Sequence, residues 1–298
     1  MKKYYVTISI LLLTVSLYSQ DTINADTLWK FNGVTSLNLS QLSLTNWAAG
    51  GENSLSGNAM VQLSADYDDS TLNWDNDLSL GFGLIRQGSD PTRKSDDKID
   101  LSSKFGYRAS KNWFYSGLFS FRTQFATGYD NPGEEDRIKI SNWMAPGYLN
   151  ISAGMDFKPN DEFSMLLAPV AGKMTLVLDD DLSAAGTFGL DPGQTIRGEF
   201  GAYIKLAYKR EILKNVLLDT KVDFFSNYLE NPQYVDVNWD LLLTFKVNDF
   251  ISASLMTQLI YDHDIEFGFD TTGDGVHDSF EPRVQFKELF GLGLTYSF

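Results

Sequence analysis

The chain has 298 residues, of which 43% are hydrophobic, and its mean hydropathy is −0.19. Its formal net charge of −15 excludes nucleic acid as a partner, because phosphate neutralisation requires an excess of Lys and Arg. The chain contains no cysteine, which excludes both a disulfide framework and a lipid anchor on an N-terminal cysteine.

The N-terminal segment has the pattern of a secretory signal peptide. Met1, Lys2 and Lys3 precede the apolar run "YYVTISILLLTVSLYS", which is too short to span a membrane. We predict a signal peptide at residues 1–20 and a polar periplasmic leader at residues 21–32. No later stretch approaches the roughly 20 apolar residues of a membrane helix, which excludes a helical membrane protein.

From residue 33 to residue 298 the chain alternates apolar and polar residues, which is the pattern of β-strands. In Leu72–Leu84 the even positions are mostly large and apolar, whereas the odd positions are Asn, Asp, Ser and Gly. Leu37 and Leu39 are out of phase with Leu42 and Leu44, which predicts a bulge in the first strand. Phe163–Leu176 is apolar at both parities, so its orientation stays open. We count about twelve strands, and an even number suits antiparallel closure.

The connections between these strands alternate between short and long. The short ones are "YDDST", "ASKNW", "KPNDE", "ILKNV" and "VNDF". The long ones lie at residues 46–54, 87–98, 128–146, 178–194, 230–234 and 263–283. Outer-membrane barrels have short periplasmic turns and long outer loops. The fold class we predict is therefore an all-β, transmembrane, antiparallel up-and-down barrel in the Gram-negative outer membrane, with both termini periplasmic.

A soluble two-sheet sandwich also has alternating strands. The predicted strands exceed the usual five or six residues, however, and aromatic residues gather near both strand ends. The chain also closes on "FGLGLTYSF", whose last strand we expect to pair with the first and so remove the sheet edge. These features favour the barrel.

Six stretches resemble an uncharacterised Bacteroidota outer-membrane barrel family, domain-of-unknown-function family 3078. They are "SLTNWAAGGENS", "SKFGYR", "TQFATGY", "FFSNYLENPQYVDVNW", "LIYDHDI" and "QFKELFGLGLTYSF". The resemblance implies a barrel and an outer-membrane location, and it implies no activity. The terminal aromatic strand is also similar to the signal that barrel-assembly machinery recognises.

If the apolar positions face lipid, the opposite parity lines the lumen with charges of both signs. The predicted lining is Lys104, Arg108, Arg122, Arg197, Glu199, Lys205, Lys221, Asp223, Asp236, Asp240, Lys246 and Lys287. Such a lumen fits either a narrow channel for a small polar solute or a salt-bridge lattice that conducts little. The sequence leaves both alternatives open.

The last long loop, "DTTGDGVHDSFE", has the spacing of a calcium loop. Its ligand positions fall at Asp270, Thr272, Asp274, Val276, Asp278 and Glu281, where only Thr272 departs from the usual Asp or Asn. An acidic solvated loop is the alternative. His277 and Ser279 in the same loop match the H-x-S spacing of outer-membrane phospholipase A, but they lack apolar flanks.

The sequence therefore predicts a non-enzymatic, porin-like outer-membrane protein without a cofactor, apart from Ca²⁺ in this loop. Its expected surroundings are outer-membrane lipid and lipopolysaccharide, with barrel-assembly machinery during biogenesis. Two alternatives remain: a scaffold that acts through acidic outer loops, and a calcium-dependent lipid hydrolase.

Overall fold

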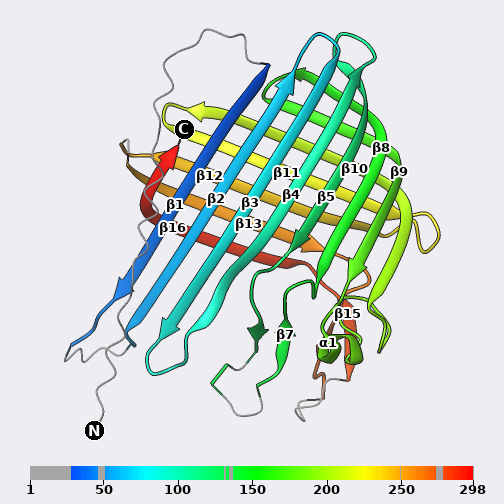
Figure 1. The fold of residues 1–298 in the computed structure, drawn as a ribbon. Helices are drawn as coiled ribbons and strands as arrows, with labels where there is room; N and C mark the ends of the chain where they lie inside the picture. The colour runs from blue at the N-terminus through cyan, green and yellow to red at the C-terminus, as the bar shows by residue number, and fades with distance from the viewer. Residues whose placement is uncertain are drawn as a thin grey trace.

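A computed structural model describes residues 28–45, 51–130, 132–133, 137–248, 250–272 and 278–297. Within these residues, twelve antiparallel strands form a closed barrel (Figure 1). The strand order around the barrel is β1-β16-β13-β12-β11-β10-β9-β8-β5-β4-β3-β2, so the last strand pairs with the first. The predicted all-β, antiparallel barrel and its number of strands are confirmed.

The barrel strands are long, as the sequence predicts. They are β1 (Trp29–Leu42), β2 (Ser54–Asp68), β3 (Leu72–Gln87), β4 (Arg93–Arg108), β5 (Trp113–Thr123), β8 (Gly147–Asn160), β9 (Phe163–Leu176), β10 (Ile196–Leu213), β11 (Val216–Asn227), β12 (Val235–Lys246), β13 (Ile251–Tyr261) and β16 (Gln285–Ser297).

Two ends of the barrel differ, and we call them the turn end and the loop end. Short connections after β2, β4, β8, β10 and β12 make the turn end, where both β1 begins and β16 finishes. Connections at the loop end carry the small hairpins β6 (Gly128–Tyr129)/β7 (Lys139–Ser141) and β14 (Glu266–Phe269)/β15 (Ser279–Pro282), and the helix α1 (Asp180–Ala184). No helix in the described part of the chain is long and apolar enough to cross a membrane.

Alternation along each strand separates an apolar outer face from a polar lumen. On β3, Trp74 and Leu84 are exposed on the outside, whereas Asp75 and Asp77 line cavities inside the barrel. At the turn end, Trp29 packs its ring against Tyr67 and Trp74, with ring centroids 5.3 and 5.7 Å apart. Such an apolar band with aromatic residues at its rim is what lipid contact selects.

Three sequence predictions about strand boundaries and shape are wrong. Strand β1 begins at Trp29, inside the predicted leader, and its pairing with β2 runs to Leu42 without the expected bulge. Leu42 differs in phase because it lies at the strand end, beside the loop. Strand β4 begins at Arg93, so most of the loop predicted at residues 87–98 is strand. The sequence of this stretch resembles a loop because it is rich in charged residues, and alternate ones are charged because they face the polar lumen.

Candidate functional site

Charged side chains bridge the middle of the lumen between walls that are far apart in the sheet. Asp240 on β12 accepts from Lys98 on β4 at 3.0 Å and from Arg122 on β5 at 3.3 Å. Five strands separate β4 from β12 in either direction around the barrel, so the Lys98–Asp240 pair joins opposite walls. Asp100 also accepts from Arg122 at 2.8 Å, and Gln258 donates to Asp240 at 3.0 Å.

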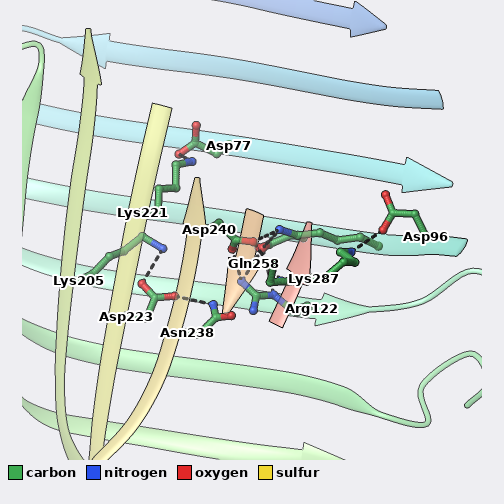
Figure 2. A network of polar contacts seen from close by, with 12 residues as sticks. Asp77, Asp96, Arg122, Lys205, Lys221, Asp223, Asn238, Asp240, Gln258 and Lys287 are labelled. Atoms are coloured by element: carbon green, nitrogen blue, oxygen red, sulfur yellow. Dashed lines mark hydrogen bonds and ion pairs between the residues drawn. The ribbon is translucent and has the colours of Figure 1, made fainter. Parts of the chain in front are cut away.

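Two further ion pairs belong to this layer, one across the lumen and one between neighbouring strands. Lys221 on β11 lies 3.3 Å from Asp77 on β3, and Lys205 on β10 lies 3.4 Å from Asp223 on β11. Figure 2 shows these side chains meeting between the two walls. We call this set the cross-lumen layer: Asp77, Lys98, Asp100, Arg122, Lys205, Lys221, Asp223 and Asp240. It consists of strand side chains of both signs.

The layer separates two chambers. The loop-end chamber has a volume of about 570 Å³ and the turn-end chamber about 330 Å³. A small cavity of about 70 Å³ lies within the layer. It shares Arg122 and Asp223 with the loop-end chamber and Asp77 and Lys221 with the turn-end chamber. The three cavities therefore follow one another along the lumen.

A second charged cluster lies at the loop-end chamber. Lys173 on β9 contacts Asp236 at 2.5 Å and Asp262 at 3.0 Å, and its ammonium lies 5.3 Å from the centre of the Phe225 ring. Arg197 and Glu199 of β10 pair at 3.0 Å beside it. Lys173 thus joins β9 to β12 and to the residue that follows β13, past the intervening strands β10 and β11.

The turn-end chamber is closed from the side by buried ion pairs. Lys104 on β4 contacts Asp156 on β8 at 2.7 Å, and the Asp156 side chain is 1% exposed. Lys158 donates to Asp75 on β3 at 3.0 Å. Each buried charge has an opposite partner, which a low-dielectric surrounding requires.

One wall of the lumen is apolar. Leu118, Leu166, Ala168, Ala171, Tyr203 and Phe225 form a buried cluster contributed by β5, β9, β10 and β11. Tyr203 and Phe225 also line the loop-end chamber, together with Tyr148, Phe188, Ile260 and Phe267. This chamber therefore combines aromatic surface with charged groups.

Two loops pack together beside the chamber mouth. Asp179 caps α1 by accepting from the backbone N–H groups of Asp181 and Leu182, and it also accepts from Lys139 at 2.9 Å and Asn142 at 2.8 Å. Burial alone would raise the pKa of Asp179. The hydrogen bonds from Lys139 and Asn142 outweigh it, so the pKa falls from 3.8 to about 2. The carboxylate stays charged and fixes the loops at ordinary pH.

Ten of the twelve predicted lumen residues belong to these ion-pair networks. They are Lys104, Arg122, Arg197, Glu199, Lys205, Lys221, Asp223, Asp236, Asp240 and Lys287. Arg108 and Lys246 lie at strand ends near the turns and line none of the three cavities. The Arg108 guanidinium instead binds the backbone carbonyls of Ser70 and Lys111.

Sequence reasoning missed several residues of the networks: Asp75, Asp77, Asp96, Lys98, Asp100, Lys158, Lys173 and Asp262. The sequence does indicate that Asp75 and Asp77 face the lumen, because both stand at the polar positions of the clear alternation in β3. Lys98 lies in the loop predicted at residues 87–98, where no inward face is expected. Lys173 lies in β9, which is apolar at both parities, so the sequence does not show which residues face inward.

The predicted calcium loop is only partly within the described residues. Asp274, Val276 and His277 lie outside them. The Asp278 carboxylate accepts from the Thr271 backbone and hydroxyl at 2.9 and 2.8 Å, and these bonds lower its pKa. Glu281 lies in β15, 3.7 Å from Arg283. In the described ranges, no group of three or more acidic or His side chains could hold a metal ion. Because part of the loop lies outside these ranges, the calcium site stays a prediction and the lipid hydrolase with His277 and Ser279 stays an alternative.

One family model matches part of the chain. Residues 39–129 match the model described as "Protein of unknown function (DUF3078)". The match agrees with the family that the sequence motifs resemble, and the model of that family carries no activity. No curated protein sequence matches the chain.

Several solved outer-membrane barrels are similar to this chain in fold. The translocator domain of the autotransporter NalP from Neisseria meningitidis is 8% identical, with a TM-score of 0.37 over 90% of this chain and 87% of that one. An outer membrane channel from Pseudomonas putida F1 is 12% identical, with a TM-score of 0.38 over 90% and 94%. The toluene transporter TodX of P. putida is 11% identical, with a TM-score of 0.28 over 90% and 78%.

Proposed function

We propose that the protein is a narrow, non-enzymatic outer-membrane channel that passes small polar solutes through its mixed-charge lumen, with both termini in the periplasm. The observation that carries this proposal is the series of three cavities along the lumen. The middle cavity is lined by strand side chains alone, so only movable side chains separate the two chambers. Rings of charged side chains are a common basis of ion and solute selectivity in pores.

The histidine among the described residues supports a non-enzymatic role. The His263 ring stacks on Tyr234 with a centroid distance of 3.6 Å, and its Nδ1 lies 3.3 Å from the Tyr261 hydroxyl. Both neighbours are tyrosines, whereas acyl-transfer chemistry requires a Ser, Cys or Thr nucleophile beside a histidine base that a third group orients. This histidine serves as a packed side chain of the chamber rim.

Conductance in a planar lipid bilayer tests the proposal. We expect small, discrete current steps, because the middle cavity is only about 70 Å³. The double variant Lys98→Met/Asp240→Asn removes a cross-lumen ion pair without changing the net charge and should increase the unit conductance. The matched control is Arg93→Met/Asp90→Asn, an ion pair outside the three cavities whose side chains are each 51% exposed, and it should conduct like the unmodified protein.

A folded barrel must be verified first by its altered mobility on an unboiled gel. If such a barrel passes no current either before or after the Lys98→Met/Asp240→Asn change, the lumen is a closed salt-bridge lattice and the proposal fails. Unchanged current steps in the double variant would place the conducting path elsewhere and would contradict the role of the cross-lumen layer.

A further inference from the structure

The seam between the first and last strands is incomplete at the loop end. Strand β1 pairs with β16 only over residues Val34–Asn38, which face Ser297–Gly293. On their other sides, β1 pairs with β2 as far as Leu42, and β16 pairs with β13 from Gln285. Residues 39–42 of β1 and 285–292 of β16 therefore have a ladder partner on one side only. In Figure 1 the two strands lie together near the C-terminus and separate toward the loop end.

Side-chain exposure agrees with an open seam. Residues 39–42 are exposed at both parities, as residues 30–32 near the start of β1 also are, whereas Ser36 and Asn38 in the paired stretch are buried. Leu39 is 66% exposed and Phe290 is 67% exposed. Backbone N–H and C=O groups without partners are costly in hydrocarbon, so closed barrels normally pair every strand along its length. An unpaired stretch in the wall is thus a place where a ligand can pass.

A side-chain latch crosses behind this seam. Lys287 on β16 donates to Asp96 on β4 at 2.7 Å, and Asn58 on β2 donates to the other Asp96 oxygen at 3.1 Å. The Lys287–Asp96 pair bypasses β1, β2 and β3, which lie between β16 and β4 in the barrel. Asp96 reaches this position because β3 has glycine beneath it: a Cβ on Gly81 would lie 2.9 Å from Asp96 Oδ2.

The latch residue Lys287 is also part of the loop-end chamber wall, as is Gln285. Opening of the latch would join the chamber to the outer surface between β1 and β16. It would also leave Lys287 without its buried carboxylate partner, and a carboxylate on the ligand would replace Asp96. Aromatic side chains, including Phe188, Tyr203 and Phe225, supply an apolar surface in the same chamber.

We propose that the loop-end chamber binds a small anionic amphiphile, a carboxylate with an apolar body, and that this ligand moves between chamber and membrane through the β1–β16 seam. The carboxylate pairs with Lys287 and releases Asp96, which couples ligand binding to opening of the seam. The apolar body lies against the aromatic wall. This lateral route goes beyond the polar channel and does not require ion conduction through the cross-lumen layer.

The absence of native cysteine makes a direct test practical. Continuing the β1–β16 register places Leu39 opposite Leu292, so Leu39→Cys/Leu292→Cys can be bridged across the seam with a short bis-maleimide. Thr35→Cys/Tyr296→Cys provides the matched control, because these two residues already face one another in the paired part. The probe is 11-(dansylamino)undecanoate, supplied from lipid vesicles to protein in lipid nanodiscs. Its entry is followed by energy transfer from the protein's tryptophans.

We expect the bridge at 39/292 to slow probe entry several-fold, whereas the bridge at 35/296 leaves the rate unchanged. Asp96→Asn, which weakens the latch outside the chamber lining, should accelerate entry. A dansyl undecylamine probe, with a cationic head, should bind more weakly. Equal entry rates with and without the 39/292 bridge would overturn the lateral route, and absence of saturable binding of the carboxylate probe would overturn the chamber's ligand class. Conductance of the same bridged samples should not change, which separates this proposal from the channel.

Discussion

Lys221 and Asp77 form an ion pair of 3.3 Å although they stand on opposite walls of the barrel, with five strands between β11 and β3 in either direction. Together with the Lys98–Asp240 pair, this contact crosses the lumen within the cross-lumen layer. Both pairs are held at lumen positions by strand parity, so each can be altered without changing the lipid-facing surface.

Neutralisation of Asp240 should change ion selectivity. Asp240 is the shared acceptor of Lys98 and Arg122, and Asp240→Asn leaves these two cations with Asp100 as their nearest acid. The local charge becomes positive, so we expect a shift toward anions on the order of tenfold at low salt, which weakens as salt increases. Reversal potentials in a KCl gradient measure it. Asp90→Asn, at an exposed position outside the three cavities, is the control, and equal selectivity in both variants would contradict the prediction.

Loss of Asp156 should destabilise the barrel strongly. Its carboxylate is buried and lies 2.7 Å from Lys104, so Asp156→Asn leaves that ammonium with the Ser164 hydroxyl at 2.9 Å and the Asp75 carboxylate at 3.5 Å. We expect a loss of about 3 kcal/mol in the free energy of unfolding. Replacement of both partners, as Lys104→Met/Asp156→Leu, should cost less, because no buried charge remains unpaired.

Urea unfolding in lipid vesicles, followed by tryptophan fluorescence, compares the two variants of this pair. Lys30→Met serves as the control, because its ion pair with Asp161 is exposed and should contribute at most about 1 kcal/mol. A double variant that is less stable than Asp156→Asn would show that the pair contributes net stability, against our expectation.

The contact between the β6/β7 hairpin and α1 should fail only in strong acid. The pKa of Asp179 is about 2 in the folded protein, below its ordinary value of 3.8. A lowered pKa means that the stabilisation is fully present above pH 3.8 and is lost as the pH falls through about 2. The pKa of Lys139 is raised by its hydrogen bonds to Asp181 and Asp179, so this lysine stays charged throughout that range.

Fluorescence of Trp143, which lies in the same loop and is 52% exposed, reports this transition in a variant that keeps Trp143 as its sole tryptophan. Asp179→Asn should abolish the acid transition and loosen the loop already at neutral pH. Asp180→Asn, at the neighbouring helix position, should retain it. A transition near pH 4 in the parent protein would contradict the lowered pKa.

The calcium prediction can be tested at two residues that the structure describes. If the spacing "DTTGDGVHDSFE" forms a calcium loop, terbium should bind with one equivalent and be displaced by calcium. Glu281→Gln and Asp278→Asn should each abolish binding, whereas Asp264→Asn, outside the ligand spacing, should retain it. Equal terbium luminescence in all three variants would dispose of the loop site.

Strand number and topology could be predicted from sequence because lipid on one side and a polar lumen on the other force strict alternation. Where the lumen wall itself is apolar, the sequence pattern does not show which positions of a strand face inward. Leu166 and Ala168 of β9 face inward into the buried cluster, so this strand is apolar at both parities and Lys173 had no visible phase. The prediction of a loop at the charged start of β4 failed for a related reason. Asp96 and Lys98 resemble solvated loop residues in the sequence, but they face the lumen in the fold.

Partners across the lumen could not be predicted from one sequence. Lys98 and Asp240 are 142 residues apart, and their contact depends on closure of the barrel and on the register of every strand between them. The incomplete seam cannot be predicted either, because residues 39–42 and 285–292 still form strands, and only the pairing of β1 with β16 shows which ladder partner is missing. Parity gives the face of the strand on which a side chain lies, but not the residue that it contacts across the lumen.

The ion pairs between opposite walls also act as mechanical braces. A tube held only by its circumference can widen gradually, whereas this barrel has struts at Lys98–Asp240 and Lys221–Asp77 that lie in the same layer. Any swelling of the cross-section must stretch both struts at once. We therefore expect the lumen to switch between narrow and wide states in a single cooperative step, and membrane tension to affect how often it switches rather than how wide it becomes.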